Sequence, residues 1–223
     1  MEGEIILLDF RFSPFAARAR IALAEKGVQY KLMEEDILVQ KSQFLIDSNP
    51  VHKKVPVLIH DGKPVCESLV IVEYIDEVWG GSRPPLMPPK EDPLRRANAR
   101  FWADFVDKKV YEGGMNLWRC KGEAEMEKAK EDYISNLKLL EGELGDAPFF
   151  GGDALGFVDV ALVPFTNVFY TMKRVGGFSV EGECPALAAW AERCKRRESV
   201  AKSVAEPVEV YEFLMSLKKK HGV

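Results

Sequence analysis

The sequence contains few of the side chains that bind transition metals. It has three histidines and four cysteines in 223 residues. The cysteines, Cys66, Cys120, Cys184 and Cys194, stand far apart and form no Cys-x-x-Cys pair. Structural zinc sites need four such ligands, usually in closely spaced pairs. We therefore expect no metal site, and we interpret the four cysteines as reduced thiols that pack inside the protein.

Long apolar runs are also missing. No segment approaches the roughly 20 consecutive apolar residues that a membrane-spanning helix needs, so we expect a soluble protein without a membrane partner. The net charge of −4 gives no general attraction for nucleic acid. Residues 1–4 show no basic region followed by an apolar core. From this we expect no secretory or transit signal and a cytoplasmic location.

The first part of the chain alternates between strand and helix patterns. Residues 4–10 form a compact apolar run that predicts a buried strand. Residues 16–26 predict a helix, because Ser13 suits its N-cap, Pro14 its first position and Gly27 its end. The next expected elements are a strand at 28–34, a short irregular helical segment at 36–49, strands at 55–60 and 64–66 joined by a hairpin at Asp61-Gly62, and a helix at 68–79.

Residues 54–68 have the features of a strand that holds an extended peptide. Pro56 has no N–H to donate, so at the head of a strand it predicts an edge strand. A cis bond between Val55 and Pro56 would turn the Val55 backbone outward, where it could pair with a ligand. Glu67 and Ser68 stand at a helix N-terminus, which favours a carboxylate, while the Glu67 acid can hold an amine. Such a site suits the zwitterionic end of an amino acid.

The remainder of the chain is predicted to be helical. Prolines at 84, 85, 88, 89 and 93 block regular structure and predict a linker. Beyond it, apolar residues recur at three- and four-residue steps. We therefore expect a first domain at 1–80, a linker at 81–93 and an all-helical domain at 94–223.

One helix of the second domain is expected at its centre. Residues 157–175 are apolar almost all round, and Pro164 should kink the helix that they form. Asp159 lies three residues after Gly156, where its carboxylate can accept the free N–H groups of the first helical turn. Further helices are predicted at 186–194 and 208–217.

Taken together, these features resemble the cytosolic glutathione transferases. The resemblance covers essentially the whole chain. The phrases IALAEKG at 21–27, NPVHKK at 49–54, PVLIH at 56–60 and CESL at 66–69 are similar to the plant tau class in particular. The resemblance implies an α/β thioredoxin-like domain that binds glutathione, an all-α helical bundle that forms most of an electrophile pocket, and a homodimer.

The resemblance also implies roles for single residues. It makes Ser13 the catalytic hydroxyl. It assigns to glutathione binding Lys41 and Lys54 at the glycyl carboxylate, Val55 at the cysteinyl backbone, Glu67 and Ser68 at the γ-glutamyl end, and also Arg18 and Phe15. Aromatic candidates for the electrophile pocket are Phe10, Phe15, Tyr111 and Trp118, although aromatic side chains at helical spacing more often belong to a core.

The chain departs from the class pattern at two places. Arg11-Phe12 stands where a tryptophan-proline pair is common, and the segment between Asp36 and Lys41 is one residue longer. Both changes affect the rim of the expected pocket and therefore the choice of electrophile.

The implied activity requires a thiolate. A cysteine thiol with a pKa near 8.5 is only a few per cent ionised at pH 7. Lowering that pKa by about two units needs about 2.7 kcal/mol, which a hydroxyl donor and a helix N-terminus can together supply. The resemblance thus implies detoxifying conjugation of glutathione, as a co-substrate, to small hydrophobic electrophiles, with no tightly bound cofactor.

Two alternatives stay open at this point. Related folds with Cys-Pro-Phe-Ala in place of residues 13–16 are glutathione-dependent thiol reductases, and a peroxidase could use the same thiolate. A serine cannot form a mixed disulfide, which speaks against the reductase. The second alternative is a non-catalytic carrier of apolar ligands on the same fold.

Overall fold

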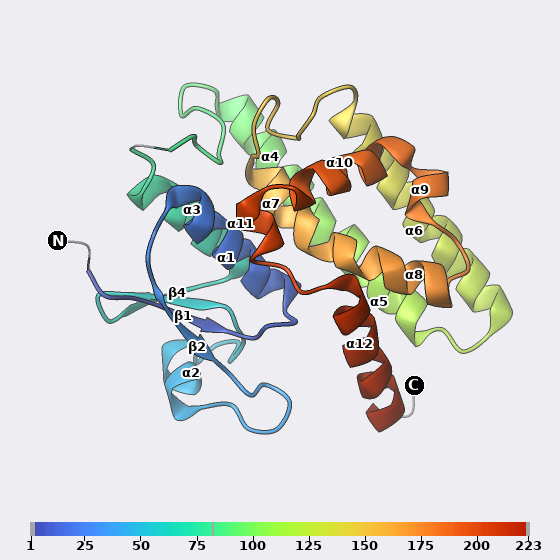
Figure 1. Cartoon of the computed structure of the whole chain (residues 1–223), viewed down its shortest axis with the longest axis horizontal. Coiled ribbons are helices and arrows are strands. Elements are labelled where there is room, and N and C mark those ends of the chain that lie inside the picture. The colour runs from blue at the N-terminus through green and yellow to red at the C-terminus, as the bar shows by residue number, and fades with distance from the viewer. Residues whose placement is uncertain (1–2, 82, 222–223) are drawn as a thin grey trace.

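The structure is a computed structural model that describes residues 3–81 and 83–221. Figure 1 shows a small sheet flanked by helices at one end of the molecule and a bundle of helices at the other. Among the described residues, no helix is both long and apolar enough to cross a membrane.

A mixed sheet of four strands organises the first part of the chain. Its strands are β1 (Ile5–Asp9), β2 (Lys31–Glu34), β3 (Val57–His60) and β4 (Lys63–Cys66), in the order β2-β1-β3-β4. β1 pairs in parallel with β2, with Leu7 opposite Leu32, and antiparallel with β3, with Leu7 opposite Leu58. Asp61 and Gly62 form the predicted hairpin turn, both with positive φ.

The two faces of the sheet are covered by different helices. Helices α1 (Pro14–Lys26) and α3 (Ser68–Val78) share a core with Leu7 and Leu58. The opposite face packs Leu8 against α2 (Gln43–Ser48). Because successive side chains of a strand point to opposite faces, the continuous apolar run of β1 serves both cores.

The cap signals of α1 act as predicted. The Ser13 oxygen accepts a hydrogen bond from the Ala16 N–H at 3.1 Å, and Pro14 is the first helical residue. Gly27 ends the helix in the left-handed conformation, with φ of 68°. This cap fixes Ser13 at the mouth of the helix.

The prediction that Pro56 heads an edge strand is wrong. β3 lies inside the sheet, between β1 and β4. The strand begins at Val57, so Pro56 lies just outside the ladder and its missing N–H removes no ladder bond. The Val55-Pro56 bond is cis, as expected.

Apart from one isolated bridge between Phe149 and Gly152, in the loop of residues 145–156, the regular structure of the second part of the chain is helical. Its elements are α4 (Pro93–Phe105), a π-helical turn η1 (Val106–Tyr111), α5 (Glu112–Arg119), α6 (Glu123–Leu144), α7 (Phe157–Leu162), a 3₁₀ segment η2 (Val163–Asn167), α8 (Val168–Val175), α9 (Val180–Glu183), α10 (Pro185–Lys195), α11 (Glu198–Ala201) and α12 (Pro207–His221). α12 packs against α8 and extends beyond the rest of the bundle (Figure 1).

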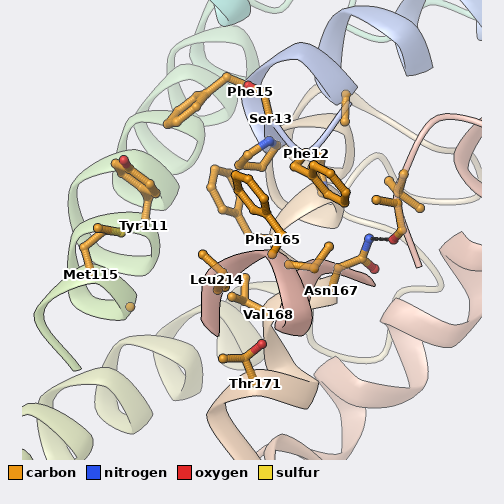
Figure 2. A pocket seen from close by; sticks show the side chains of 18 of the residues that line it. Phe12, Ser13, Phe15, Tyr111, Met115, Phe165, Asn167, Val168, Thr171 and Leu214 are labelled. Atoms are coloured by element: carbon orange, nitrogen blue, oxygen red, sulfur yellow. Dashed lines mark hydrogen bonds between the residues drawn. The ribbon is translucent and has the colours of Figure 1, made fainter. Parts of the chain in front are cut away.

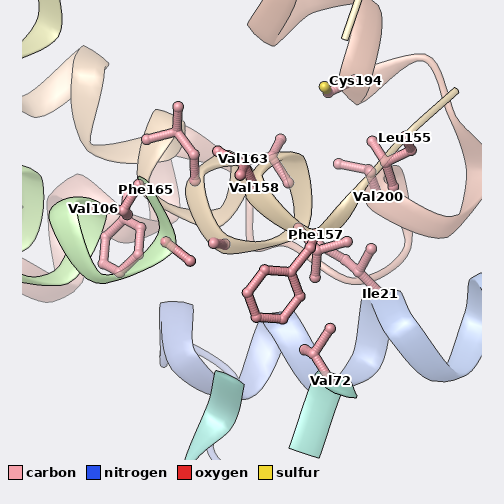
Figure 3. Packing of buried hydrophobic residues seen from close by; sticks show 14 of the residues in the cluster. Ile21, Val72, Val106, Leu155, Phe157, Val158, Val163, Phe165, Cys194 and Val200 are labelled. Atoms are coloured by element: carbon pink, nitrogen blue, oxygen red, sulfur yellow. The ribbon is translucent and has the colours of Figure 1, made fainter. Parts of the chain in front are cut away.

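The central helix forms as predicted, with its break at Pro164. Every residue of α7 is buried, and the 3₁₀ segment η2 that contains Pro164 separates it from α8. Figure 3 shows Phe157 next to Ile21 and Val72, which belong to the first part of the chain. One core therefore joins α7 to α1 and α3 and holds the two parts of the chain together.

Asp159 caps this helix from within, as its position predicted. Its carboxylate accepts the N–H of Gly156 at 2.8 Å, of Gly151 at 2.9 Å and of Phe150 at 3.0 Å. The indole N–H of Trp190 is a fourth donor, at 2.7 Å. The side chain is fully buried, and this burial raises the pKa of Asp159. The carboxylate thus ties the start of α7 to α10.

Candidate active site

A cavity of about 370 Å³ lies between the two parts of the chain. Its wall is formed by residues 10–15, which join β1 to α1, by η1 and α5, by η2 and α8, and by α12. The side chains drawn in Figure 2 are largely aromatic or aliphatic. The cavity therefore favours an apolar ligand.

All five residues that the sequence suggested for the catalytic hydroxyl and the electrophile pocket line this cavity. These residues are Phe10, Ser13, Phe15, Tyr111 and Trp118. Phe15 contacts Tyr111 edge to face, with ring centroids 4.9 Å apart. Phe12, expected at the rim of the pocket, also lines it, whereas the sequence did not indicate the further lining residues Met115, Phe165, Val168, Thr171, Phe213 and Leu214. The spacing of these residues along their helices can be read from the sequence, but the packing of the helices around the cavity cannot.

Ser13 presents a hydroxyl at the N-terminus of α1. Its oxygen accepts the Ala16 N–H, while its backbone N–H donates to the Phe10 carbonyl at 2.8 Å. Because the oxygen acts as an acceptor in the cap, the hydroxyl proton is available for another acceptor. The helix dipole favours negative charge at the same place. This arrangement can stabilise an anion that enters the cavity beside α1.

Arg18 lies behind this helix end and is fully buried. Its guanidinium donates to the Ala161 carbonyl at 2.9 Å, to the Ser68 hydroxyl at 3.1 Å and to the Asp107 carboxylate. Burial lowers the pKa of Arg18, and the ion pair with Asp107 opposes this shift. The guanidinium is occupied by these protein groups, so it could influence a ligand only through its electric field and through Ser68.

The residues expected at the tripeptide site gather at the paired ends of β3 and β4. Val57 is opposite Cys66 in the sheet, which places Val55 and Glu67 just beyond the same end of the hairpin. Glu67 has a positive φ of 69°, and its exposed carboxylate lies 3.7 Å from the imidazole of His52. No side chain caps the first turn of α3, so its N–H groups can bind an anion.

Two lysines lie on loops next to this hairpin end. The Lys41 ammonium donates to the Lys53 carbonyl at 2.8 Å. The Lys54 carbonyl accepts from the Asn49 amide at 3.0 Å, and the Lys54 side chain is exposed. Lys41 and Lys54 are therefore held in one neighbourhood by backbone contacts, where their charges can attract a carboxylate.

Arg11 and Phe12, the residues that depart from the class pattern, contact the C-terminal helix. Arg11 binds both carboxylate oxygens of Glu209, at 2.7 and 2.6 Å. Phe12 stacks on Phe213, and Phe10 packs against the same ring. These contacts fasten α12 to the β1–α1 loop along one side of the cavity.

Comparison with known proteins gives a consistent match over the chain. The models of the glutathione S-transferase N-terminal and C-terminal domains match residues 3–77 and 85–198. The chain is 55% identical over 220 residues to a probable glutathione S-transferase, parC, of Nicotiana tabacum, covering 99% of this chain and 98% of that one. It is 52% identical to glutathione S-transferase U25 of Arabidopsis thaliana, covering 100% and 99%.

Comparison with solved structures points to the same family as comparison with these relatives. Rice GST1 (OsGSTU1), solved in complex with glutathione, superposes with a TM-score of 0.93 at 53% identity and full coverage of both chains. The tau class enzyme MiGSTU of mango, Mangifera indica, superposes with a TM-score of 0.90 at 40% identity, covering 96% of this chain and 98% of that one. The α/β thioredoxin-like domain followed by a helical domain is thus confirmed.

Proposed function

The chain belongs to the plant tau class of the glutathione S-transferases, and from this premise we propose that it joins the sulfur of glutathione to small hydrophobic electrophiles. The observation that carries the proposal is the placement of Ser13. Its hydroxyl stands at the mouth of α1 and faces a cavity with a largely apolar wall. Detoxification of reactive apolar compounds is the role that follows.

The chemistry needs glutathione as a thiolate. Ser13 donates its hydroxyl proton to the sulfur, and the N-terminus of α1 adds a favourable dipole. The thiol loses its own proton to solvent, so Ser13 remains neutral and no base is required. The thiolate then attacks an electrophilic carbon, which either loses its leaving group or, in an addition, gives up its π electron pair to the neighbouring atom, which takes a proton from solvent.

The tripeptide lies along the end of the β3–β4 hairpin in this proposal. The backbone of Val55 pairs with the cysteinyl residue, and Glu67 and Ser68 bind the γ-glutamyl amine and carboxylate. Lys41 and Lys54 bind the glycyl carboxylate. The contacts of Lys41 with Lys53 and of Ser68 with Arg18 support these roles, because they hold both side chains near the hairpin end.

Thiol-disulfide reduction is not favoured as the function. A reductase needs a cysteine thiolate, and Ser13 occupies the position that a nucleophilic cysteine would take. Burial raises the pKa of the thiols of Cys66, Cys120, Cys184 and Cys194, so each is a poor nucleophile at neutral pH. All four are free, in keeping with a reducing compartment, and we place the protein in the cytoplasm.

We also propose a homodimer that forms through the face of α3 and α4. Large apolar side chains are exposed there: Val70 on α3 at 55%, and Leu94 and Phe101 on α4 at 71% and 59%. The ion pair of Glu73 and Arg100 joins α3 to α4, and exposed apolar side chains on two neighbouring helices are typical of a protein contact. Phe101→Glu should give a monomer by light scattering, while Leu139→Glu, at an exposed site on α6, should leave the dimer intact.

The conjugation of glutathione with 1-chloro-2,4-dinitrobenzene tests the proposed activity. Ser13→Ala should lower kcat/KM by about 10- to 100-fold, the value of one hydrogen bond to a charged acceptor. Ser179→Ala is the matched control, because the Ser179 oxygen also caps a helix, accepting from Gly182 at 3.1 Å. Equal losses in both variants, or no conjugation by the wild type with a panel of electrophiles, would refute the proposal.

A further inference from the structure

The hydroxyl of Thr171 is buried without a partner. Thr171 lies on α8 and is 0% exposed. Among the described residues, its oxygen is the single buried side-chain nitrogen or oxygen that lacks a hydrogen-bond partner. Burying a hydroxyl in this way is unfavourable, because its hydrogen bonds to water are lost and not replaced.

This behaviour is unusual for a threonine in a helix. A helical threonine commonly donates to a carbonyl three or four residues earlier. Thr166, in the preceding 3₁₀ segment, does so and donates to the Val163 carbonyl at 2.8 Å. The Thr171 hydroxyl has no such bond. Valine has nearly the same shape and would fill this position without the penalty.

Thr171 lines the same cavity as Ser13. In Figure 2 the two side chains lie at opposite ends of the view, with Phe165, Val168 and Leu214 between them. Thr171 therefore offers a hydroxyl to this largely apolar space at a place separate from Ser13. In the proposed function the Ser13 hydroxyl donates a hydrogen bond to the sulfur of glutathione, whereas the Thr171 hydroxyl has no part in that chemistry.

We propose that Thr171 recognises an uncharged oxygen acceptor, such as a carbonyl or nitro oxygen, at the end of the electrophile remote from its reacting carbon. The inference rests on the proposed function, which puts the electrophile in this cavity. A ligand oxygen satisfies the buried hydroxyl, and the apolar residues Val168 and Met172, which line the cavity from the same helix, disfavour a charged group by its desolvation cost. The substrate class is therefore apolar molecules with one terminal polar oxygen.

Binding of a matched, unreactive pair of ligands tests this directly. The pair is 4-phenyl-2-butanone and butylbenzene, which have similar shapes and differ in one carbonyl. Each ligand displaces the uncharged fluorescent probe N-phenyl-1-naphthylamine from the protein saturated with glutathione, and the ratio of the two inhibition constants is measured. Taking the ratio cancels changes that affect both ligands equally.

Thr171→Val should reduce the preference for the ketone about threefold to tenfold, the size of one neutral hydrogen bond. The affinity for butylbenzene should stay the same or rise. Thr171→Ser keeps the hydroxyl and should retain the preference. Thr166→Val is the matched control, because its hydroxyl is buried outside the cavity lining and bonded to Val163, and the ratio should not change.

An unchanged ratio in Thr171→Val, or the same loss in Thr166→Val, would overturn the inference. A second arm compares conjugation of hexyl isothiocyanate and 5-oxohexyl isothiocyanate, whose carbonyl is insulated from the reacting carbon. Thr171→Val should lower kcat/KM for the oxo compound alone. If the wild type conjugates neither compound but the binding ratio falls in Thr171→Val, the proposed function fails and the role of Thr171 stands.

Discussion

Phe12 and Phe213 stack face to face across the two parts of the chain, with ring centroids 4.5 Å apart and ring planes inclined by 7°. Phe12 follows the first strand, and Phe213 lies in the last helix. Both rings line the cavity. Together with the Arg11–Glu209 ion pair, the stack determines where α12 closes the apolar space.

Loss of this stack should weaken binding of the electrophile and leave binding of glutathione unchanged. Phe213→Ala removes the contacts with Phe12 and Phe10, each aromatic pair being worth about 0.5 to 1.5 kcal/mol. Steady-state kinetics should show KM for a hydrophobic electrophile raised about threefold to tenfold. Leu139→Ala, at an exposed site on α6, is the control. An equal rise in KM for glutathione would contradict this prediction, because it would show that α12 also affects the binding of glutathione.

Removal of the buried Arg18 guanidinium should lower the free energy of unfolding by less than the loss of a fully buried ion pair does, but by clearly more than the loss of an exposed one. Arg18→Met leaves the Asp107 carboxylate without its partner and the Ser68 hydroxyl without its donor. Breaking a buried ion pair costs about 3 to 5 kcal/mol, and the 33% exposure of the Asp107 side chain reduces this to about 2 to 4. Urea unfolding measures the loss. Lys202→Met, which breaks an exposed pair with Glu198, should barely shift the unfolding midpoint.

The buried cap of α7 should matter more for stability than for activity. Asp159→Ala leaves four N–H donors without their acceptor, and each unsatisfied group costs about 1 to 3 kcal/mol. We expect a loss of at least about 3 kcal/mol in the free energy of unfolding. Asp153→Ala, an exposed site on the preceding loop, controls for the loss of a charge. A midpoint equal to that of the control would refute the capping role.

The buried thiols should react only at high pH. Burial raises the pKa of Cys184 to about 11, with Glu141 adding to the shift. The thiolate fraction, and with it the rate of alkylation by iodoacetamide, should therefore increase about tenfold for each pH unit up to that value. Peptide mapping by mass spectrometry gives the rate for each cysteine. Labelling of Cys184 at about pH 8 as fast as in the unfolded chain would contradict the burial.

Local signals in the sequence were enough to predict most of the fold. The cap of α1 by Ser13 and Gly27, the turn at Asp61-Gly62 and the break at Pro164 each depend on neighbouring residues alone. The position of β3 inside the sheet was missed, because strand order depends on pairing between distant segments.

The candidate site was predictable only in part for the same reason. Ser13, Phe15 and Tyr111 were identified from the sequence and line one cavity. Phe213 and Thr171 were not, because nothing in their helices indicates which side faces the cavity. The unpaired state of the Thr171 hydroxyl is a property of packing and has no signature in the sequence.

The ionisation of bound glutathione tests the central claim most directly. The thiolate absorbs in the ultraviolet, so titration of the complex gives the pKa of the bound thiol. We predict a value about two units below that of free glutathione in the wild type, and a return toward the free value in Ser13→Ala. A bound pKa equal to the free one, or one that Ser13→Ala leaves unchanged, would contradict the account.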